Sequence, residues 1–390
     1  MTLRGAACIV GAYEHPTRKA VEQSTAQLHA EVARGALNDA GLRHSDVDAY
    51  FCAGDAPGLG PLSMVEYMGL RPCYIDSTDT GGSSYVMAVA HAAAAIHAGK
   101  CSIALITCAG RPRASKVPVE VDVAKYAGPT VPEVPFESPY RENFANTYAM
   151  AARRHMHEYG TTSEQLAWVK VAASHHAQHN PHAMLRDVVT VNDVLNSPMI
   201  ADPLHKLDCC VVSDGGGALV VVHPDIARTI PRPLIKILGT GEAVKHMDGG
   251  RVDLTWSAAR FSGAAAFKEA GVSPKDINYV SIYDSFTINV VIQLEDLGFC
   301  EKGKGGSFVA DGNLISGVGT LPFNTDGGGL CNNHPGNRGG ILKVIEAVRQ
   351  LRGEAQPQVQ VPNCSLALAN GFGGSLGTRH GTGTLIMERI

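Results

Sequence analysis

The feature of this chain that most constrains its fold is an internal duplication. The stretch from Ala40 to Asp48 precedes a predicted strand, and the similar stretch from Ala270 to Asn278, 230 residues further on, precedes another. A Gly-rich turn that leads into a helix also occurs twice, at residues 79–99 and 327–351. Units that recur in this way indicate two halves of similar topology. We therefore predict one half at residues 1–225 and a second at 226–390, packed so that the two Gly-rich turns lie near one another.

The first Gly-rich turn, residues 79–84, leads into a helix that we expect to be buried. Gly81 and Gly82 have no side chains, so backbone or a ligand can approach them closely. The segment from Tyr85 to Ala98 is apolar on every face apart from two histidines, which is typical of a buried helix. Such a turn can hold a reacting carbonyl group, or it can simply precede a core helix. These residues alone leave both alternatives open.

Strands and helices alternate along the first half. Ala6–Gly11, Val47–Ala53 and Ile103–Cys108 read as buried strands, and Glu22–Ala40 as a helix between the first two. This alternation predicts an α/β protein whose strands pair mainly in parallel.

Composition and charge exclude several classes of function. With 45% hydrophobic and 18% charged residues and a net charge of -4, the chain is typical of a globular protein and offers nothing to nucleic acid or an anionic membrane. Its ten cysteines form no C-x-x-C pair, so we expect no zinc ribbon and no redox motif. The first residues lack the apolar core of a signal peptide, and no stretch is typical of a membrane span. These features predict a reduced, cytoplasmic protein.

Two regions depart from the α/β pattern. Residues 111–142 contain six prolines and little periodicity, which is typical of a functional lid or an interface loop. Further on, a helix that begins with a capping box at Thr162 ends among four histidines, His175, His176, His179 and His182. The spacing of His175 and His179 would suit a metal pair, but the helix breaks at residues 180–181. We therefore expect solvated surface histidines and no metal site.

Several local stretches, spread over nearly the whole chain, resemble the thiolase superfamily. They are residues 159–162 (YGTT), 207–210 (LDCC), 213–215 (SDG), 283–287 (YDSFT), 294–299 (LEDLGF), 324–328 (NTDGG), 334–336 (HPG) and 371–374 (GFGG). The most similar branch is that of the sterol-carrier-protein-x and lipid-transfer-protein thiolases, which includes the steroid side-chain aldolases.

This resemblance implies a five-layered αβαβα fold made of two duplicated halves. It also implies a coenzyme A thioester as substrate, no permanently bound cofactor, and a dimer or a higher assembly. The insertion at about residues 111–160 would then shape the acyl-CoA tunnel.

The resemblance also shows where the family pattern is broken. The nucleophilic cysteine of a thiolase would fall at Gly82, or one residue to either side, and no thiol is present there. Ser83 is an alternative nucleophile, but a serine needs a paired base. The second cysteine is missing as well, since the C-terminal loop around Gly373 contains no thiol. Covalent acyl transfer by the usual thiolase route is therefore not expected.

Two other site positions hold residues that can move protons. His334 stands where the family's histidine activates the nucleophile or binds the thioester oxygen, and Tyr283 stands where thiolases carry asparagine or histidine. Steroid side-chain aldolases have tyrosines at both positions, so the identity of the base stays open. Cys331 could supply a displaced thiol, or it could be a small loop residue. The amides of Asn332, Asn333 and Asn337 could donate hydrogen bonds to the substrate.

Three hypotheses follow for the function. The first is an acyl-CoA lyase of aldolase type, in which Tyr283 and His334 handle protons and the backbone at Gly82 and Ser83 forms part of an oxyanion site. The second is a non-standard β-ketoacyl-CoA thiolase or acyltransferase that uses Cys331 or Ser83. The third is a non-catalytic acyl-CoA-binding subunit. Resemblance further suggests a homodimer and a small zinc-containing OB-fold partner.

Overall fold

The computed structural model describes residues 2–115, 143–248, 251–336 and 339–390. The strands are β1 (Cys8–Glu14), β2 (Ala49–Cys52), β3 (Tyr74–Ser77), β4 (Ile103–Gly110), β5 (Met199–Ala201), β6 (Leu204–His205), β7 (Gly215–Val222), β8 (Ile235–Lys245), β9 (Tyr279–Ile282), β10 (Leu366–Ser375) and β11 (Thr378–Arg389). The helices are α1 (Thr25–Ala40), α2 (Pro61–Met68), α3 (Ser84–His97), α6 (Phe144–Tyr159), α7 (Ser163–Ala177), α8 (Val191–Leu195), α9 (Pro224–Ala227), α10 (Ala259–Ala270), α11 (Thr287–Asp296), α12 (Gly305–Val309) and α13 (Gly340–Arg352).

The strand order shows the same topology twice. The large sheet runs β3-β2-β4-β7-β1-β8-β11-β10-β9. Read outward from the junction of β1 and β8, the order β1-β7-β4-β2 matches β8-β11-β10-β9, and each pair has the same direction in both sets. The two sets meet at the pairs Cys8↔Lys236 and Ile9↔Ile235. The boundary that we predict at residue 225 stays a prediction.

The expectation of mainly parallel strands was wrong. β7 and β11 are antiparallel to both of their neighbours within their own set. Only β2–β3, β2–β4 and β9–β10 are parallel among the pairs of the large sheet that the described residues form. β10 and β11 are joined by a tight turn that closes with the pair Ser375↔Thr378, and such a turn can connect only antiparallel strands.

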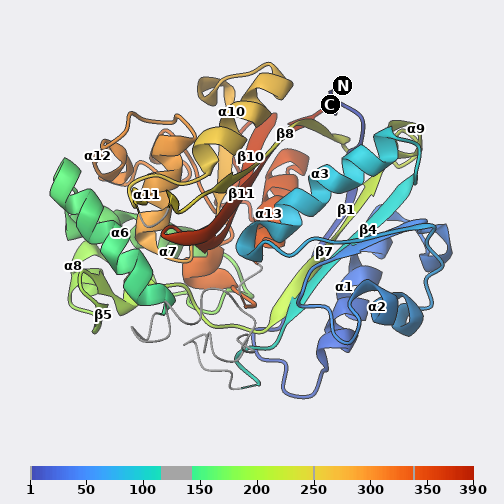
Figure 1. Cartoon of the computed structure of the whole chain (residues 1–390), viewed down its shortest axis with the longest axis horizontal. Helices are drawn as coiled ribbons and strands as arrows, with labels where there is room; N and C mark the ends of the chain where they lie inside the picture. The colour runs from blue at the N-terminus through green and yellow to red at the C-terminus, as the bar shows by residue number, and fades with distance from the viewer. Residues whose placement is uncertain (1, 116–142, 249–250, 337–338) are drawn as a thin grey trace.

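Helices cover and separate the two sets of strands. α1 packs on β1 and β7 through an apolar cluster that includes Val32 and Ala36. α3 and α13 lie side by side in the centre of the molecule, and one apolar cluster joins them to strands of both sets (Figure 1). α10 packs on β8 and β11, and α11 packs against α10. These layers agree with the predicted five-layered α/β fold.

Local sequence explains where these helices begin and end. Ser24 caps α1 by accepting a hydrogen bond from the backbone N–H of Gln27, and α1 ends at Gly41 with a φ of 68°. The capping box predicted at Thr162 opens α7. α3 is buried along its length except at His91, Ala94 and His97, as its apolar sequence predicts.

The prediction of surface histidines was wrong for His176. Its ring is 1% exposed and accepts a hydrogen bond from the backbone N–H of Ser316, and burial lowers its pKa to about 3. His175 and His179 are partly exposed and His182 is exposed. Among the described residues, no group of three or more His, Cys, Asp or Glu side chains is placed to hold a metal ion.

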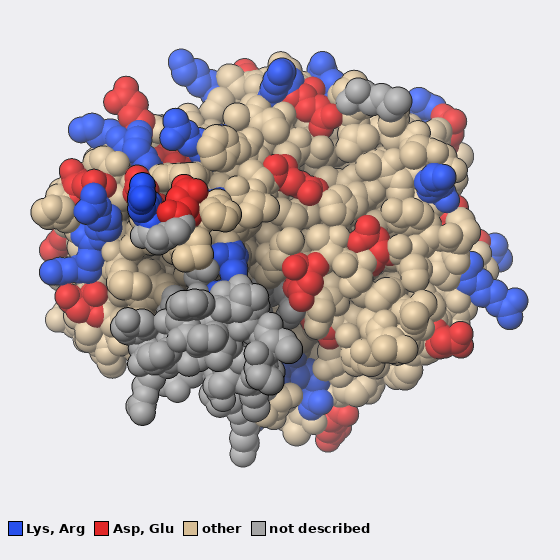
Figure 2. Space-filling view, in the orientation of Figure 1, with Lys and Arg blue, Asp and Glu red and all other residues tan. Residues whose placement is uncertain are grey.

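The surface in Figure 2 carries acidic and basic residues interspersed over the visible face, without a patch of one sign. Within the described ranges, no helix is long and apolar enough to cross a membrane. Most of the Pro-rich segment lies outside the described residues, so the prediction that it shapes an acyl-CoA tunnel is untested at 116–142.

Candidate active site where the two Gly-rich turns meet

The first Gly-rich turn forms a short 3-10 helix, Gly81–Ser83, directly before α3. Gly82 has no space for a side chain. A Cβ atom there would overlap the carbonyl oxygen of Phe372 and would lie 2.5 Å from Cζ of Tyr283. The phenol ring of Tyr283 therefore occupies the space that a side chain at residue 82 would need.

Glycines of the second half close against this turn. A Cβ on Gly340 would overlap the carbonyl oxygen of Gly82, and one on Gly373 would overlap that of Thr80. A Cβ on Gly371 would lie 2.8 Å from Cα of Ser83. The two Gly-rich turns therefore meet, as the duplication predicts.

Tyr283 and His334 form a hydrogen-bonded pair beside the turn. Tyr283 Oη lies 2.8 Å from His334 Nε2, and the two rings meet edge to face with centroids 5.5 Å apart. Burial raises the pKa of Tyr283 well above its usual value of 10. Burial also lowers the pKa of His334 to about 4, and the nearby Asp284 carboxylate offsets this only in part. Both groups are therefore neutral at pH 7, and a single proton lies in the hydrogen bond between Oη and Nε2.

The backbone of Tyr283 is fixed from both sides. β9 ends at Ile282, so Tyr283 is the first residue beyond the strand. Its N–H donates to the carbonyl of Asn370 at 3.0 Å, and its carbonyl accepts from Nε2 of Gln293 at 2.7 Å. The phenol is thus held by β10 on one side and by α11 on the other.

Three other candidate residues direct their side chains elsewhere. Ser83 Oγ donates to the carbonyl of Thr80 at 2.8 Å. Cys331 is 1% exposed within an apolar cluster, and burial raises the pKa of its thiol. The amide of Asn333 bonds Glu14 and Ser213. The structure thus brings Tyr283, His334, Gly82 and Gly373 together, whereas Asn337 lies outside the described residues.

Sequence reasoning missed a buried ion pair beneath the loop that carries His334. Asp284 Oδ1 lies 2.5 Å from Nζ of Lys343 and accepts from the backbone N–H of Gly329 at 2.9 Å. Its other oxygen accepts from the N–H of Leu330 at 3.2 Å. Asp284 directly follows Tyr283 in the family stretch, but its partner on α13 is 59 residues away, so no local pattern relates the two.

Aromatic side chains lie close to the pair. Tyr148 on α6 stacks on Phe286 with ring centroids 4.8 Å apart, and its ring lies 6.1 Å from that of Phe372. The hydroxyl of Tyr148 donates to the carbonyl of Gly374 at 2.8 Å. These rings form an apolar wall that links α6, the start of α11 and β10.

Comparison with known proteins matches the chain to two family models. Residues 7–225 match the thiolase N-terminal domain, and residues 241–389 match the thiolase C-terminal domain-like model. An acetyl-CoA acetyltransferase of Methanothermobacter thermautotrophicus is 35% identical over 360 residues, covering 89% of this chain and 91% of that protein. A steroid side-chain-cleaving aldolase of Thermomonospora curvata is 35% identical over 375 residues, with the same coverage. A solved structure of an Ltp2-ChsH2(DUF35) aldolase superposes with a TM-score of 0.89 at 32% identity, covering 99% of this chain and 98% of that one.

Proposed function

This chain belongs to the thiolase family, and from that premise we propose that it is an acyl-CoA lyase that cleaves a β-hydroxyacyl-CoA by a retro-aldol reaction. The observation that carries the proposal is the neutral Tyr283–His334 pair, set against a turn whose Gly82 leaves no space for a nucleophilic side chain. The similarity to the steroid side-chain-cleaving aldolase supports the same reaction class.

A retro-aldol cleavage needs a base for the β-hydroxyl proton and a stabiliser for the enolate that forms. In our proposal Tyr283 accepts the proton of the substrate hydroxyl while its own proton passes to Nε2 of His334. The Cα–Cβ bond then breaks, its electron pair moves into the thioester enolate, and the β-carbon leaves as a ketone or aldehyde. The proton returns from His334 through Tyr283 to Cα, which gives the shorter acyl-CoA and restores both groups.

Burial lowers the pKa of His334 to about 4, so the imidazole is unprotonated at pH 7 and Nε2 is free to accept a proton. A ring with so low a pKa is a weak base, so the transfer needs the developing negative charge of the enolate beside it. The imidazolium is formed only while the enolate charge develops nearby, so the two charges stabilise one another. The backbone N–H groups at the start of α3, where the helix dipole is positive, are our candidates for holding the enolate oxygen.

An acyltransferase is the second candidate, because the acetyl-CoA acetyltransferase relative is as similar to this chain as the aldolase is. Acyl transfer through cysteine requires a thiolate. Burial raises the pKa of Cys331, and Ser83 donates to Thr80 rather than to a base. These contacts favour the lyase. A non-catalytic acyl-CoA-binding subunit is the third candidate, and it predicts no turnover at all.

Release of a carbonyl compound from a β-hydroxyacyl-CoA tests the proposal. We expect the wild-type chain to release a ketone or aldehyde, and Tyr283→Phe to lose at least about 100-fold in rate, as is usual for a lost acid–base group. Tyr67→Phe, a change to an exposed phenol on α2, is the matched control and should keep the wild-type rate. Equal rates for wild type and Tyr283→Phe would refute the role of Tyr283.

We also propose two assemblies. The similar solved structure is that of an aldolase together with a DUF35 protein, which supports a partner of that type for this chain, and co-purification after co-expression would test it. The OB-fold and zinc of that partner remain predictions, as does a cytoplasmic location. A homodimer is supported by β3, which pairs on one side only among the described residues and has Leu59, Leu62 and Ile75 exposed around it, because unpaired edges and exposed apolar residues favour association. Light scattering of Ile75→Lys against wild type would test it.

A further inference from the structure

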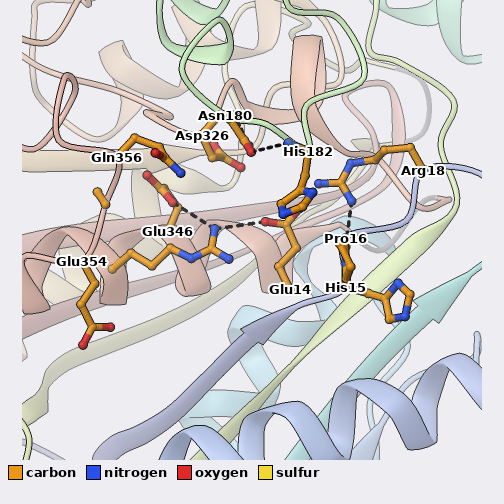
Figure 3. A pocket seen from close by; sticks show the side chains of 12 residues that line it. Glu14, His15, Pro16, Arg18, Asn180, His182, Asp326, Glu346, Glu354 and Gln356 are labelled. Carbon is orange, nitrogen blue, oxygen red and sulfur yellow. Dashed lines mark hydrogen bonds and ion pairs between the residues drawn. The ribbon is translucent and has the colours of Figure 1, made fainter.

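A polar cavity of about 160 Å³ adjoins the loop that carries His334. Figure 3 shows Glu14, at the end of β1, pointing into it together with Arg18, Asp326 and Glu346. Glu14 also reaches the residue next to His334, since its Oε1 accepts from Nδ2 of Asn333 at 3.0 Å. The cavity and the candidate active site therefore share one hydrogen-bond network.

The carboxylate of Glu14 is held in its ionised form. Burial alone would raise its pKa, but Arg18 at 2.6 Å and Arg349 at 3.1 Å, with the hydrogen bond from Asn333, outweigh burial and lower the pKa to about 2. An ionised carboxylate only accepts hydrogen bonds. Glu14 therefore fixes which way the amide of Asn333 points.

This orientation of Asn333 matches the hydrogen bonds that follow it up to His334. With Nδ2 of Asn333 bound to Glu14, its Oδ1 faces Ser213 and accepts from Oγ at 2.8 Å. The hydroxyl proton of Ser213 is used in that bond, so its oxygen is left to accept from the backbone N–H of His334 at 2.7 Å. The backbone N–H of His334 can only donate and the Glu14 carboxylate can only accept, so the two ends together hold all three hydrogen bonds in one direction.

We propose that Glu14 is a positioning residue for His334, acting through Asn333 and Ser213. This inference rests on the function proposed above. A glutamine at residue 14 can either donate or accept. The uncharged amide holds Arg18 and Arg349 less tightly than the carboxylate does, and one of its two polar atoms donates instead of accepting, so Nδ2 of Asn333 loses its fixed acceptor. Asn333 can then shift together with the Ser213 hydroxyl that accepts from the N–H of His334. The backbone of His334 loses its single fixed position, and Nε2 no longer stays at hydrogen-bond distance from Tyr283.

Glu14→Gln tests the inference, with Glu354→Gln as the matched control. Glu354 lines the same cavity but is exposed and pairs with Arg232, whereas Glu14 accepts the hydrogen bond from Asn333. We expect Glu14→Gln to lower kcat about tenfold with KM nearly unchanged, because a small misplacement of a catalytic group acts on the chemical step. The imidazole ¹⁵N signals of His334, assigned by their loss in His334→Gln, should shift in Glu14→Gln and stay in place in Glu354→Gln.

A folded Glu14→Gln protein whose kcat and His334 signals coincide with those of Glu354→Gln would overturn the inference. If Glu14→Gln does not fold, Ser213→Ala decides by the same two measurements, because it removes the acceptor of the His334 N–H directly. The ring signals need no turnover. A chain that cleaves no β-hydroxyacyl-CoA would therefore refute the proposed function, while the signals would still support or overturn the positioning role.

Discussion

Replacing Gly82 with alanine is the sharpest test of how the site is packed. The new methyl group would lie 2.5 and 2.6 Å from two ring atoms of Tyr283 and would overlap the carbonyl oxygen of Phe372. Carbon atoms in contact normally stay about 3.5–4.0 Å apart, so the ring must move by about 1 Å. Because one of the two obstacles is backbone, rotation of the Tyr283 side chain cannot relieve the strain completely.

The magnitude follows from this geometry. Overpacking a dense core costs about 1–3 kcal/mol, and two simultaneous obstacles place Gly82→Ala near the upper end. An unfolding entropy of about 2.1 cal/mol/K per residue gives about 0.8 kcal/mol/K for 390 residues, so a loss of about 3 kcal/mol lowers Tm by about 4 °C. Displacing the phenol from His334 should also lower kcat by about 100-fold.

Thermal unfolding and carbonyl release measure both effects. Gly377→Ala is the matched control, because a Cβ there meets only Leu254 at an ordinary 3.6 Å. In a Tyr283→Ala background the cost of Gly82→Ala should shrink without vanishing, since the Phe372 carbonyl remains. If Gly82→Ala has the Tm and kcat of Gly377→Ala, Tyr283 does not fill the space at residue 82 and the packing argument fails.

Three further predictions concern the groups around the site. Because the neutral form of His334 accepts the proton, kcat/KM should stay level as pH falls through 6.5 and decline only near pH 4, whereas a decline centred at 6.5 would contradict the buried environment. Between pH 6.5 and pH 4 the unfolded chain binds more protons than the folded one, so the free energy of unfolding from urea titrations should fall as the pH is lowered through this range. His176 and His380, whose pKa values burial also lowers, contribute in the same direction. Cys331→Ser should keep the rate of carbonyl release within about twofold and carry no acyl adduct by intact-protein mass spectrometry, and a lost adduct together with lost activity would favour the acyltransferase. Lys343→Met leaves the Asp284 carboxylate buried without its cation and should lower the free energy of unfolding in urea by about 3–5 kcal/mol. Arg43→Gln, which breaks an exposed ion pair, is the control and should change almost nothing. Equal effects of the two substitutions would show that the Lys343–Asp284 pair does not stabilise the loop.

Much of the fold was predictable because it depends on local patterns. The buried α3, the capping box that opens α7, and the meeting of the two Gly-rich turns all follow from residue spacing, glycine and the duplication. Strand direction was not predictable. It depends on how β7 and β11 enter the sheet, and a buried apolar run of residues has the same composition in either direction.

The candidate site was predictable only in part. Resemblance to a family drew attention to Tyr283 and His334, but their 2.8 Å contact depends on how the end of β9 faces the loop before α13. The groups that support them lie far away in sequence. Glu14 is 319 residues from Asn333, and Lys343 is 59 residues from Asp284, so no spacing rule connects them. His176 was misplaced for a related reason, because only tertiary packing distinguishes it from its exposed neighbours.

Dependence on free coenzyme A tests the central claim most directly. Retro-aldol cleavage consumes only the thioester, whereas a thiolase needs free coenzyme A to release its acyl group. We predict that the chain splits a β-hydroxyacyl-CoA into a carbonyl compound and a shorter acyl-CoA at a rate independent of added coenzyme A, and that the mass of the protein stays unchanged during turnover. Cleavage of a β-ketoacyl-CoA that requires coenzyme A and passes through an acylated protein would contradict the account.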